Sequence, residues 1–173
     1  MSGKICVESR SPAQTELIGE KLAAQLSGGE VIALYGGLGM GKTNFVRGLA
    51  RGLGVEEGVS SPTFALVNEY HGRLTLYHFD MYRVTTWEDL YSTGFFDYLD
   101  TGAVLAVEWS ENIQEALPED SIHIKLSQQH TAVDQSGGGR FCGGFYRKYF
   151  HKPLIPSMVI SRSVSVPPRW SST

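Results

Sequence analysis

The chain has no apolar run long enough to cross a membrane. Val31–Tyr35 and Ala103–Val107 are apolar throughout, but each has only the length of a strand. A membrane helix needs roughly 20 apolar residues. The first residues, Met1–Arg10, contain no long apolar stretch, so no secretory signal peptide is expected. We therefore expect a soluble, cytoplasmic protein without a membrane partner.

Cysteine is almost absent. The two cysteines, Cys6 and Cys142, lie far apart in the sequence, with no C-x-x-C pair and no Cys/His ligand spacing. Neither a zinc site nor a disulfide framework is indicated. Two scattered thiols are typical of a protein in a reducing cytosol.

Charged residues are few, and their distribution divides the chain. They make up 19% of the 173 residues, and the net charge of −3 indicates no particular partner. Residues 1–126 contain 9 Lys+Arg against 17 Asp+Glu, a net charge of −8, whereas residues 127–173 contain 6 Lys+Arg and 1 Asp, a net charge of +5. This asymmetry predicts a folded domain over residues 1–126 and a chemically different segment over residues 127–173.

The composition of residues 127–173 predicts a poorly defined tail. Gly137–Gly144 contains five glycines in eight residues, and Lys152–Pro156 and Val166–Pro168 carry four prolines between them. We predict no helix or strand in this segment and expect much of it to be mobile.

The rest of the chain alternates between strand-like and helix-like patterns, as in an α/β fold with a mostly parallel sheet. Helices are predicted at Ala13–Leu26, with Ser11 as N-cap and Pro12 as first residue, and at Thr43–Leu53, Thr86–Tyr91 and Phe95–Leu99. Strands are predicted at Val31–Tyr35, at Phe64–Tyr70 and Leu74–Phe79 around a His71-Gly72-Arg73 turn, at Ala103–Val107 and at Ser121–Leu126.

A glycine-rich loop separates the first strand from the second helix. Its residues, which match the pattern G-x-x-x-x-G-K-[ST], are Gly36, Gly37, Leu38, Gly39, Met40, Gly41, Lys42 and Thr43. The glycines let successive backbone N–H groups converge on one anion, and the helix that follows begins with unpaired N–H groups. Lys42 adds a positive charge for the β and γ phosphates, and the Thr43 hydroxyl can ligate Mg²⁺. Because the loop lies between an apolar strand and an amphipathic helix, it predicts a site for ATP with Mg²⁺.

Two acids stand at predicted strand ends, where a parallel sheet brings them beside such a loop. Glu108 follows Ala103–Val107 directly, and Asp80 follows Leu74–Phe79. Either can hold the metal's water shell or orient an attacking water. The alternatives are a solvated acid at Glu108 and a helix or turn cap at Asp80.

Three other residues have both a functional and a structural interpretation. Thr63, in the polar turn Ser60-Ser61-Pro62-Thr63, is either part of a switch that senses the γ-phosphate or part of a turn or helix cap. Trp109, next to Glu108, packs in the core or stacks on a partner or substrate. His78, inside a predicted strand, is interpreted as a core histidine.

These segments, in this order, resemble the TsaE family, also called YjeE, of small bacterial ATPases required for threonylcarbamoyladenosine in tRNA. The segments that carry the resemblance are Leu34-Tyr35-Gly36 leading into Gly41-Lys42-Thr43, then Ser61-Pro62-Thr63-Phe64, His78-Phe79-Asp80-Met81-Tyr82-Arg83 and Val107-Glu108-Trp109. The resemblance covers about residues 10–126.

The resemblance implies a P-loop NTPase-like three-layer sandwich with weak, Mg²⁺-dependent ATP hydrolysis. It implies a TsaB–TsaD-type partner pair that transfers threonylcarbamoyl to adenosine 37 of tRNA, while the TsaE-like member resets the transferase. Contact with tRNA is then indirect, and DNA is no partner.

The resemblance also implies a role for each matching residue. Lys42 and Thr43 bind phosphate and Mg²⁺, Glu108 is a Mg²⁺ ligand or water-orienting acid, and Asp80 supports the metal site. Thr63 belongs to the switch loop, and Trp109 supports hydrolysis or coupling.

The chain departs from the family in two places of the loop region and at its end. Gly37 stands where the family usually has an acid, and Asn44 where it often has a second Thr. After about His130 the sequence no longer matches the family's final strand and helix, and we hypothesise that this ending is replaced here.

Two other functions fit the same loop. A small kinase also needs a lid rich in arginine, but Arg47, Arg51, Arg73 and Arg83 are scattered. A nucleotide-dependent binding module would use ATP only to organise the switch loop, with incidental turnover. A GTPase is less favoured, because no N-K-x-D motif is present.

Overall fold

Strands and helices alternate along most of the chain. The computed structural model describes residues 4–129 and 157–163. The strands are β1 (Lys4–Ser9), β2 (Val31–Tyr35), β3 (Val67–His71), β4 (Thr75–Asp80), β5 (Val104–Glu108), β6 (Ile122–Gln129) and β7 (Ser157–Ser163). The helices are α1 (Pro12–Ala23), α2 (Lys42–Gly52), α3 (Trp87–Ser92), α4 (Phe95–Leu99) and the 3-10 helix η1 (Ser110–Ala116). None of the helices in these ranges has both the length and the apolar character to span a bilayer.

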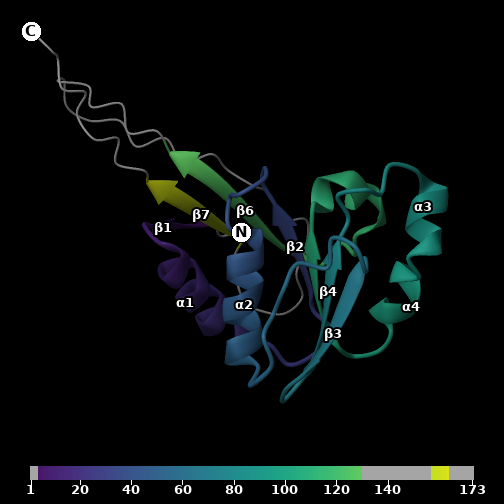
Figure 1. The fold of residues 1–173 in the computed structure, drawn as a ribbon, viewed down its shortest axis with the longest axis horizontal. Helices are drawn as coiled ribbons and strands as arrows, with labels where there is room; N and C mark the ends of the chain where they lie inside the picture. The colour runs from purple at the N-terminus through teal and green to yellow at the C-terminus, as the bar shows by residue number, and fades with distance from the viewer. Residues whose placement is uncertain (1–3, 130–156, 164–173) are drawn as a thin grey trace, which may run out of the picture.

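The described strands form one sheet in the order β1-β7-β6-β2-β5-β4-β3. All neighbouring pairs run parallel except β3 and β4, which form an antiparallel hairpin. The predicted mostly parallel sheet and the predicted hairpin are therefore confirmed. In Figure 1, β2 lies in the middle of the sheet, with α1 and α2 on one side of the picture and α3 and α4 on the other.

Side chains of the central strands alternate between the two faces of the sheet. In β5, Val104 and Ala106 belong to the apolar cluster that includes α1 and α2, whereas Leu105 and Val107 belong to the cluster that includes α3, α4 and η1. A strand buried on both faces reads as a continuous apolar run, which is why its sequence shows no polar alternation. The protein thus has the three-layer α/β arrangement that was predicted.

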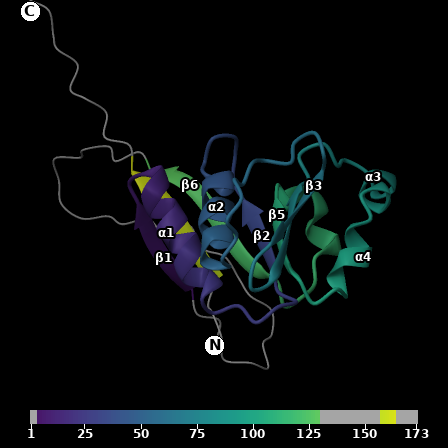
Figure 2. The same cartoon turned by 60° about the horizontal axis from the view of Figure 1, so that its bottom comes forward.

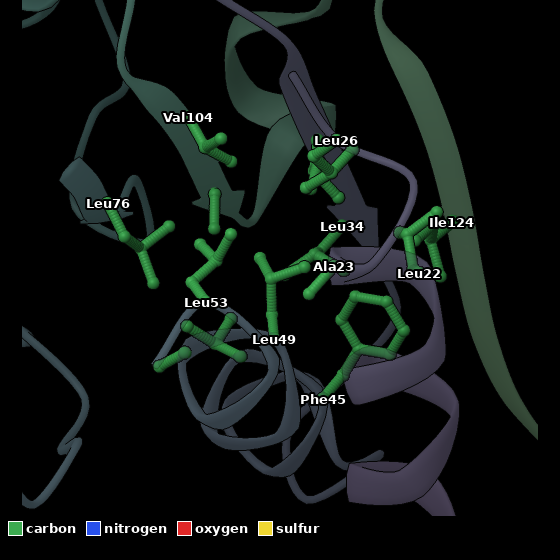
Figure 3. Close-up of a cluster of buried hydrophobic side chains, with 14 of the residues drawn as sticks. Leu22, Ala23, Leu26, Leu34, Phe45, Leu49, Leu53, Leu76, Val104 and Ile124 are labelled. Atoms are coloured by element: carbon green, nitrogen blue, oxygen red, sulfur yellow. The ribbon is translucent and has the colours of Figure 1, made fainter. Parts of the chain in front are cut away.

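The first layer is held by close packing of α1 against α2, which lie side by side in Figures 1 and 2. α1 begins as predicted, with Pro12 in its first turn and the Ser11 side chain accepting a hydrogen bond from Gln14 N. Phe45, Leu49 and Leu53 from the α2 segment point into the cluster, toward Leu22 and Leu26 of the α1 segment and Leu34 of β2 (Figure 3). A Cβ atom at Gly48 of α2 would stand 1.8 Å from the carbonyl oxygen of Glu16 in α1, so glycine permits the close approach.

The structure differs from the sequence predictions mainly toward the two edges of the sheet. β1 was not predicted, and the hairpin strand β3 begins at Val67 instead of Phe64. β6 runs to Gln129, across the domain boundary predicted after residue 126. The prediction of no strand in residues 127–173 is wrong at Ser157–Ser163, which forms β7 between β1 and β6. The predicted tail otherwise falls on residues 130–156 and 164–173, outside the described residues.

Gly48→Ala is expected to destabilise the fold. Overpacking of a tight contact costs about 1–3 kcal/mol, which exceeds the gain of up to about 1 kcal/mol from replacing a helical glycine. The net cost of up to about 2 kcal/mol corresponds, for a chain of this size, to a melting temperature lower by up to roughly 8 °C. Gly58→Ala is the matched control, because a Cβ there meets nothing within 4 Å. Equal melting temperatures for both variants would contradict the packing argument.

A buried pair joins β2 to β6 just before the glycine-rich loop. The Tyr35 hydroxyl lies 2.8 Å from His123 Nδ1, and the two rings stack with centroids 5.6 Å apart. Burial raises the pKa of Tyr35 to about 12, so the hydroxyl keeps its hydrogen at neutral pH. Burial lowers the pKa of His123, so the folded state favours the neutral imidazole.

Acid is therefore expected to weaken the fold in part through His123. Below pH about 6.5 the unfolded chain binds a proton at this position more readily than the folded chain. The contribution of His123 to stability is complete above that pH and is lost as the pH falls toward the lowered folded pKa. Urea midpoints measured from pH 7.5 to 5 should fall less steeply in His123→Gln than in wild type. His71→Gln, at an exposed histidine, is the control, and identical slopes for wild type and His123→Gln would refute the assignment.

Candidate active site

The parallel register gathers the ends of three strands at one edge of the sheet. β2 leads into the glycine-rich loop, β4 ends at Asp80 and β5 ends at Glu108. Leu34 of β2 and Asp80 of β4 are both register partners of Glu108. The two acids thus stand beside the loop, as predicted from their positions after apolar strands.

A cleft of about 440 Å³ opens at this edge. Its walls are residues 38–44 of the loop and α2, together with Ser61, Thr63, Asp80, Tyr82, Glu108 and Trp109. The structure therefore brings together Lys42, Thr43, Thr63, Asp80, Glu108 and Trp109, which are all the candidate catalytic and metal-binding residues named from the sequence. Of the predicted loop residues, Gly36 and Gly37 do not line the cleft itself.

The loop has the backbone geometry of an anion site. Gly36 has φ 134°, and a Cβ there would stand 2.4 Å from the carbonyl oxygen of Leu126 in β6. α2 begins at Lys42 with Gly41 as N-cap and no side-chain cap, so no side-chain acceptor occupies the first-turn N–H groups. Gly37 is different, because its φ is ordinary and nothing lies within 4 Å of an added Cβ. The acid that the TsaE pattern has at this position would therefore fit.

Lys42 is folded back on its own loop. Its Nζ donates hydrogen bonds to the carbonyl oxygens of Gly36 and Gly37, the latter at 2.9 Å, and lies 3.9 Å from the centre of the Trp109 ring. The side chain is buried, and burial lowers its pKa, against the opposing effect of the nearby carboxylates of Glu108, Glu111 and Asp80. The ammonium is thus held at the cleft without a direct carboxylate partner among the described residues.

The Glu108 carboxylate is buried and is approached from two other elements. Thr43 Oγ1 of α2 donates to Glu108 Oε1 at 2.8 Å, and His78 Nε2 of β4 lies 2.9 Å from the same oxygen. Because the ionised carboxylate only accepts, Nε2 carries the hydrogen. His78 Nδ1 has no hydrogen-bond partner among the described residues. Glu108 is therefore oriented by the loop on one side and by β4 on the other.

His78 is a site residue that the sequence interpretation missed. It is fully buried, as expected of a core histidine, but its ring contacts the acid at the site. The available signal was its spacing from Asp80, because residues two apart in a strand lie on the same face. His78 and Asp80 therefore lie on the same face of β4, beside the end of β5 that borders the cleft.

Asp80 is held by the polar turn before the hairpin. Ser61 Oγ and Thr63 Oγ1 donate to Asp80 Oδ2 at 3.1 and 3.0 Å, and Tyr82 N donates to Oδ1 at 3.0 Å. Asp80 therefore does cap a turn, as the alternative interpretation had it, and it also lines the cleft. Any movement of Thr63 would be transmitted directly to this carboxylate.

Trp109 closes the cleft beside Lys42. It is partly buried, its ring centroid lies 4.8 Å from that of Tyr82, and its backbone has φ 59°, a left-handed conformation that is costly for a bulky residue. That conformation turns the chain from β5 into η1 directly after Glu108. Arg83, by contrast, does not line the cleft and lies 5.4 Å from the exposed Phe64 ring.

The oxygen atoms at the cleft suit a hard divalent cation. Mg²⁺ in phosphate sites takes one or two protein oxygens and completes its shell with phosphate and water. The Thr43 hydroxyl and the Glu108 carboxylate already touch, and Asp80 is the register partner of Glu108. Among the described residues no group of three or more His, Cys, Asp and Glu is arranged to hold a metal by itself. The donor set therefore fits Mg²⁺ bound jointly with a nucleotide.

Comparison with known proteins identifies close relatives of this chain. A family model described as threonylcarbamoyl adenosine biosynthesis protein TsaE matches residues 9–136. A tRNA threonylcarbamoyladenosine biosynthesis protein TsaE from Treponema pallidum is 45% identical over 121 residues, which cover 70% of this chain and 89% of the relative. The protein of the same name from Bacillus subtilis is 41% identical over 120 residues, covering 68% and 74%.

A solved structure agrees with these sequence matches. The crystal structure of YdiB from Bacillus subtilis superimposes with a TM-score of 0.58 at 36% sequence identity, covering 68% of this chain and 72% of that one. The residues matched by the family model include the loop, both acidic strand ends and the turn that holds Asp80. The resemblance noted from the sequence is thereby confirmed: the chain belongs to the TsaE family, whose members take part in the biosynthesis of threonylcarbamoyladenosine in tRNA.

Proposed function

We propose that this protein binds Mg-ATP in the cleft and hydrolyses it slowly, as an accessory to threonylcarbamoylation of tRNA adenosine 37. The observation that carries the proposal is the meeting of four separate segments, represented by Lys42, Thr63, Asp80 and Glu108, around one cleft. Its partner is a TsaB–TsaD-type transferase pair, and tRNA is met through that pair. The names of the related proteins support the pathway.

The loop supplies the phosphate site. The N–H groups at the start of α2 are free of side-chain caps, and such groups together with the helix dipole favour a bound anion. The Lys42 ammonium, next to the loop carbonyls, is within the same cleft and adds the full positive charge that a triphosphate requires. The loop residues Gly36, Gly37, Leu38, Gly39, Met40, Gly41, Lys42 and Thr43 are assigned to this role.

Glu108 and Asp80 supply the chemistry at the γ-phosphate. Bound Mg²⁺, held by Thr43 and the two acids, would neutralise charge that develops on the phosphate oxygens. Glu108, oriented by His78, is placed to accept a proton from an attacking water or to orient that water. Asp80 keeps its geometry through Ser61 and Thr63, so the turn that contains Thr63 acts as the switch.

A low basal rate follows from the contacts of Lys42. Its donors are engaged with the carbonyl oxygens of Gly36 and Gly37, and its charge lies over the Trp109 ring. These contacts must be exchanged for phosphate contacts before the charge can assist the reaction. A partner that moves Trp109 or the loop therefore has a route to stimulate hydrolysis.

Lys42→Ala is expected to weaken ATP binding. Loss of a charged hydrogen-bond donor costs about 1.5–3 kcal/mol, or roughly 10- to 150-fold in affinity. Lys21→Ala, at an exposed lysine of α1, is the control for the charge lost in Lys42→Ala.

Glu108→Gln is expected to separate ATP binding from ATP hydrolysis. Loss of the acid should leave calorimetric binding of Mg-ATP within a few-fold of wild type and lower kcat by at least about 100-fold.

The outcomes also distinguish the alternative functions. If Glu108→Gln lost hydrolysis but still supported the transferase pair, the protein would be a nucleotide-dependent binding module. Unchanged ATP binding in Lys42→Ala would refute the assignment of the cleft.

His78 is expected to act on kcat through Glu108. His78→Leu removes the donor to the buried carboxylate and should lower kcat roughly 10-fold or more, since a hydrogen bond to a charged group contributes about 1.5–3 kcal/mol, with a smaller change in KM for ATP. His78→Gln retains a donor in nearly the same place and should recover part of the rate. Steady-state kinetics on both variants, with melting temperatures as a check on folding, test this. Equal rates in the two variants would reduce His78 to a packing role.

A further inference from the structure

We propose that the groove between α3 and η1 is the docking site for a lysine- or arginine-rich segment of the protein partner. This inference rests on the proposed function, because it assigns the surface through which the transferase pair is bound. It concerns residues outside the nucleotide cleft.

The groove is the larger of the two main hollows on the described part of the molecule. It has a volume of about 560 Å³. One wall is formed by residues 84–87 and Leu90, at the start of α3, and the other by residues 111–116 of η1. None of the phosphate-loop residues contributes to it. A hollow of this size is large enough to receive side chains of another protein.

The stretch of sequence that supplies both walls of the groove carries acids and no lysine or arginine. Between Arg83 and Lys125 the sequence contains no lysine and no arginine. Over the same stretch it contains nine acids, which are Glu88, Asp89, Asp97, Asp100, Glu108, Glu111, Glu115, Glu119 and Asp120. All of these are exposed except Glu108 in the cleft and the half-buried Asp89, which caps α3. Glu111 and Glu115 line the groove itself.

Exposed aromatic rings accompany the acids. Trp87 is 47% exposed and Tyr91 66% exposed, with ring centroids 6.3 Å apart. Trp87 lines the groove. Aromatic faces and carboxylates together favour lysine and arginine side chains, through cation–π contact and charge pairing. The same charges repel a phosphate backbone, so this face suits a basic protein segment and not tRNA.

Both walls of the groove connect to the nucleotide cleft by short routes. η1 begins directly after Glu108 and Trp109, and the other wall begins four residues after Asp80. Asn112 Nδ2 donates to the carbonyl oxygen of Met81 at 2.8 Å, and Met81 N donates to the carbonyl oxygen of Glu108 at 3.0 Å. A segment held between the walls would therefore be able to shift the backbone that carries Asp80 and Glu108.

The test uses the full chain with the double charge reversal Glu88→Lys/Glu115→Lys. Glu111 is left in place because it lies close in sequence to Glu108 and Trp109 of the cleft. Calorimetric affinity for a purified TsaB–TsaD-type pair should fall by at least about 10-fold, since juxtaposed like charges are strongly unfavourable. Stimulation of hydrolysis by the pair should fall with it, while hydrolysis by the isolated variant stays at the wild-type rate.

The matched control is Glu119→Lys/Asp120→Lys. It changes the net charge by the same amount in the exposed turn before β6, at the opposite edge of the sheet from the cleft. Its affinity for the pair should remain near that of wild type. If both double variants lost the same affinity, only overall charge would matter and the groove would not be the docking site.

A second variant keeps the test decisive if the charge reversal does not fold. Trp87→Ala removes an exposed ring without changing charge and should also weaken binding. Wild-type affinity in Trp87→Ala and in any folded reversal would overturn the proposal, as would tRNA binding that the groove variants abolish. Failure of wild type to bind the pair would likewise overturn it, whereas failure of wild type to bind or hydrolyse ATP would instead refute the proposed function.

Discussion

The site depends on the buried carboxylate of Glu108. Glu108 is 3% exposed, and a charge removed from water in this way is tolerated only when hydrogen bonds replace its hydration. Thr43 and His78 provide these bonds from α2 and β4. The loop and the two parallel strands are therefore joined at one atom, Glu108 Oε1. Any change at one of these elements alters the hydrogen bonding of the acid. The hydrogen bonds that compensate for the burial of the Glu108 charge are therefore the same ones that orient it at the cleft.

The sequence predicts the part of the molecule in which local pattern and final structure coincide. β2 has the predicted limits Val31–Tyr35, α2 differs from its prediction by one residue at each end, and both short helices are found. The loop motif and the acids after apolar strands predicted the cleft residues, since parallel strands place their carboxyl ends at one edge. The contact of His78 with Glu108 was missed because it depends on which strands are neighbours, and apolar pattern carries no information on strand order. The acidic groove was missed for a related reason. Its walls are 21 or more residues apart in sequence, counted from Leu90 to Glu111, and only the fold makes them face each other.

The strands β1 and β7 show the same limit and reveal what supports the loop. β1 was not predicted, and β7 comes from a segment whose composition predicted no strand. Each is stabilised by pairing with a strand far away in the sequence, a contribution that no local propensity contains. β7 pairs with β6, and β6 pairs in turn with β2 and presents the Leu126 carbonyl against Gly36. In the described fold, the boundary predicted after residue 126 would cut β6 and would leave β1 without the strand that connects it to the sheet.

The nucleotide cleft and the groove between α3 and η1 differ in electrostatic character, and their separation explains how one small domain can serve two ligands. The loop and α2 must attract polyphosphate, so they offer backbone N–H groups and Lys42. The charged side chains that line the groove are the acids Glu111 and Glu115, beside the Trp87 ring, so the groove disfavours nucleotide and nucleic acid alike and suits a basic protein segment. The two sites are joined through the backbone, because Asn112 Nδ2 donates to the carbonyl oxygen of Met81 and Met81 N donates to the carbonyl oxygen of Glu108. A partner docked in the groove therefore acts on the chain that carries Glu108 without contacting the nucleotide.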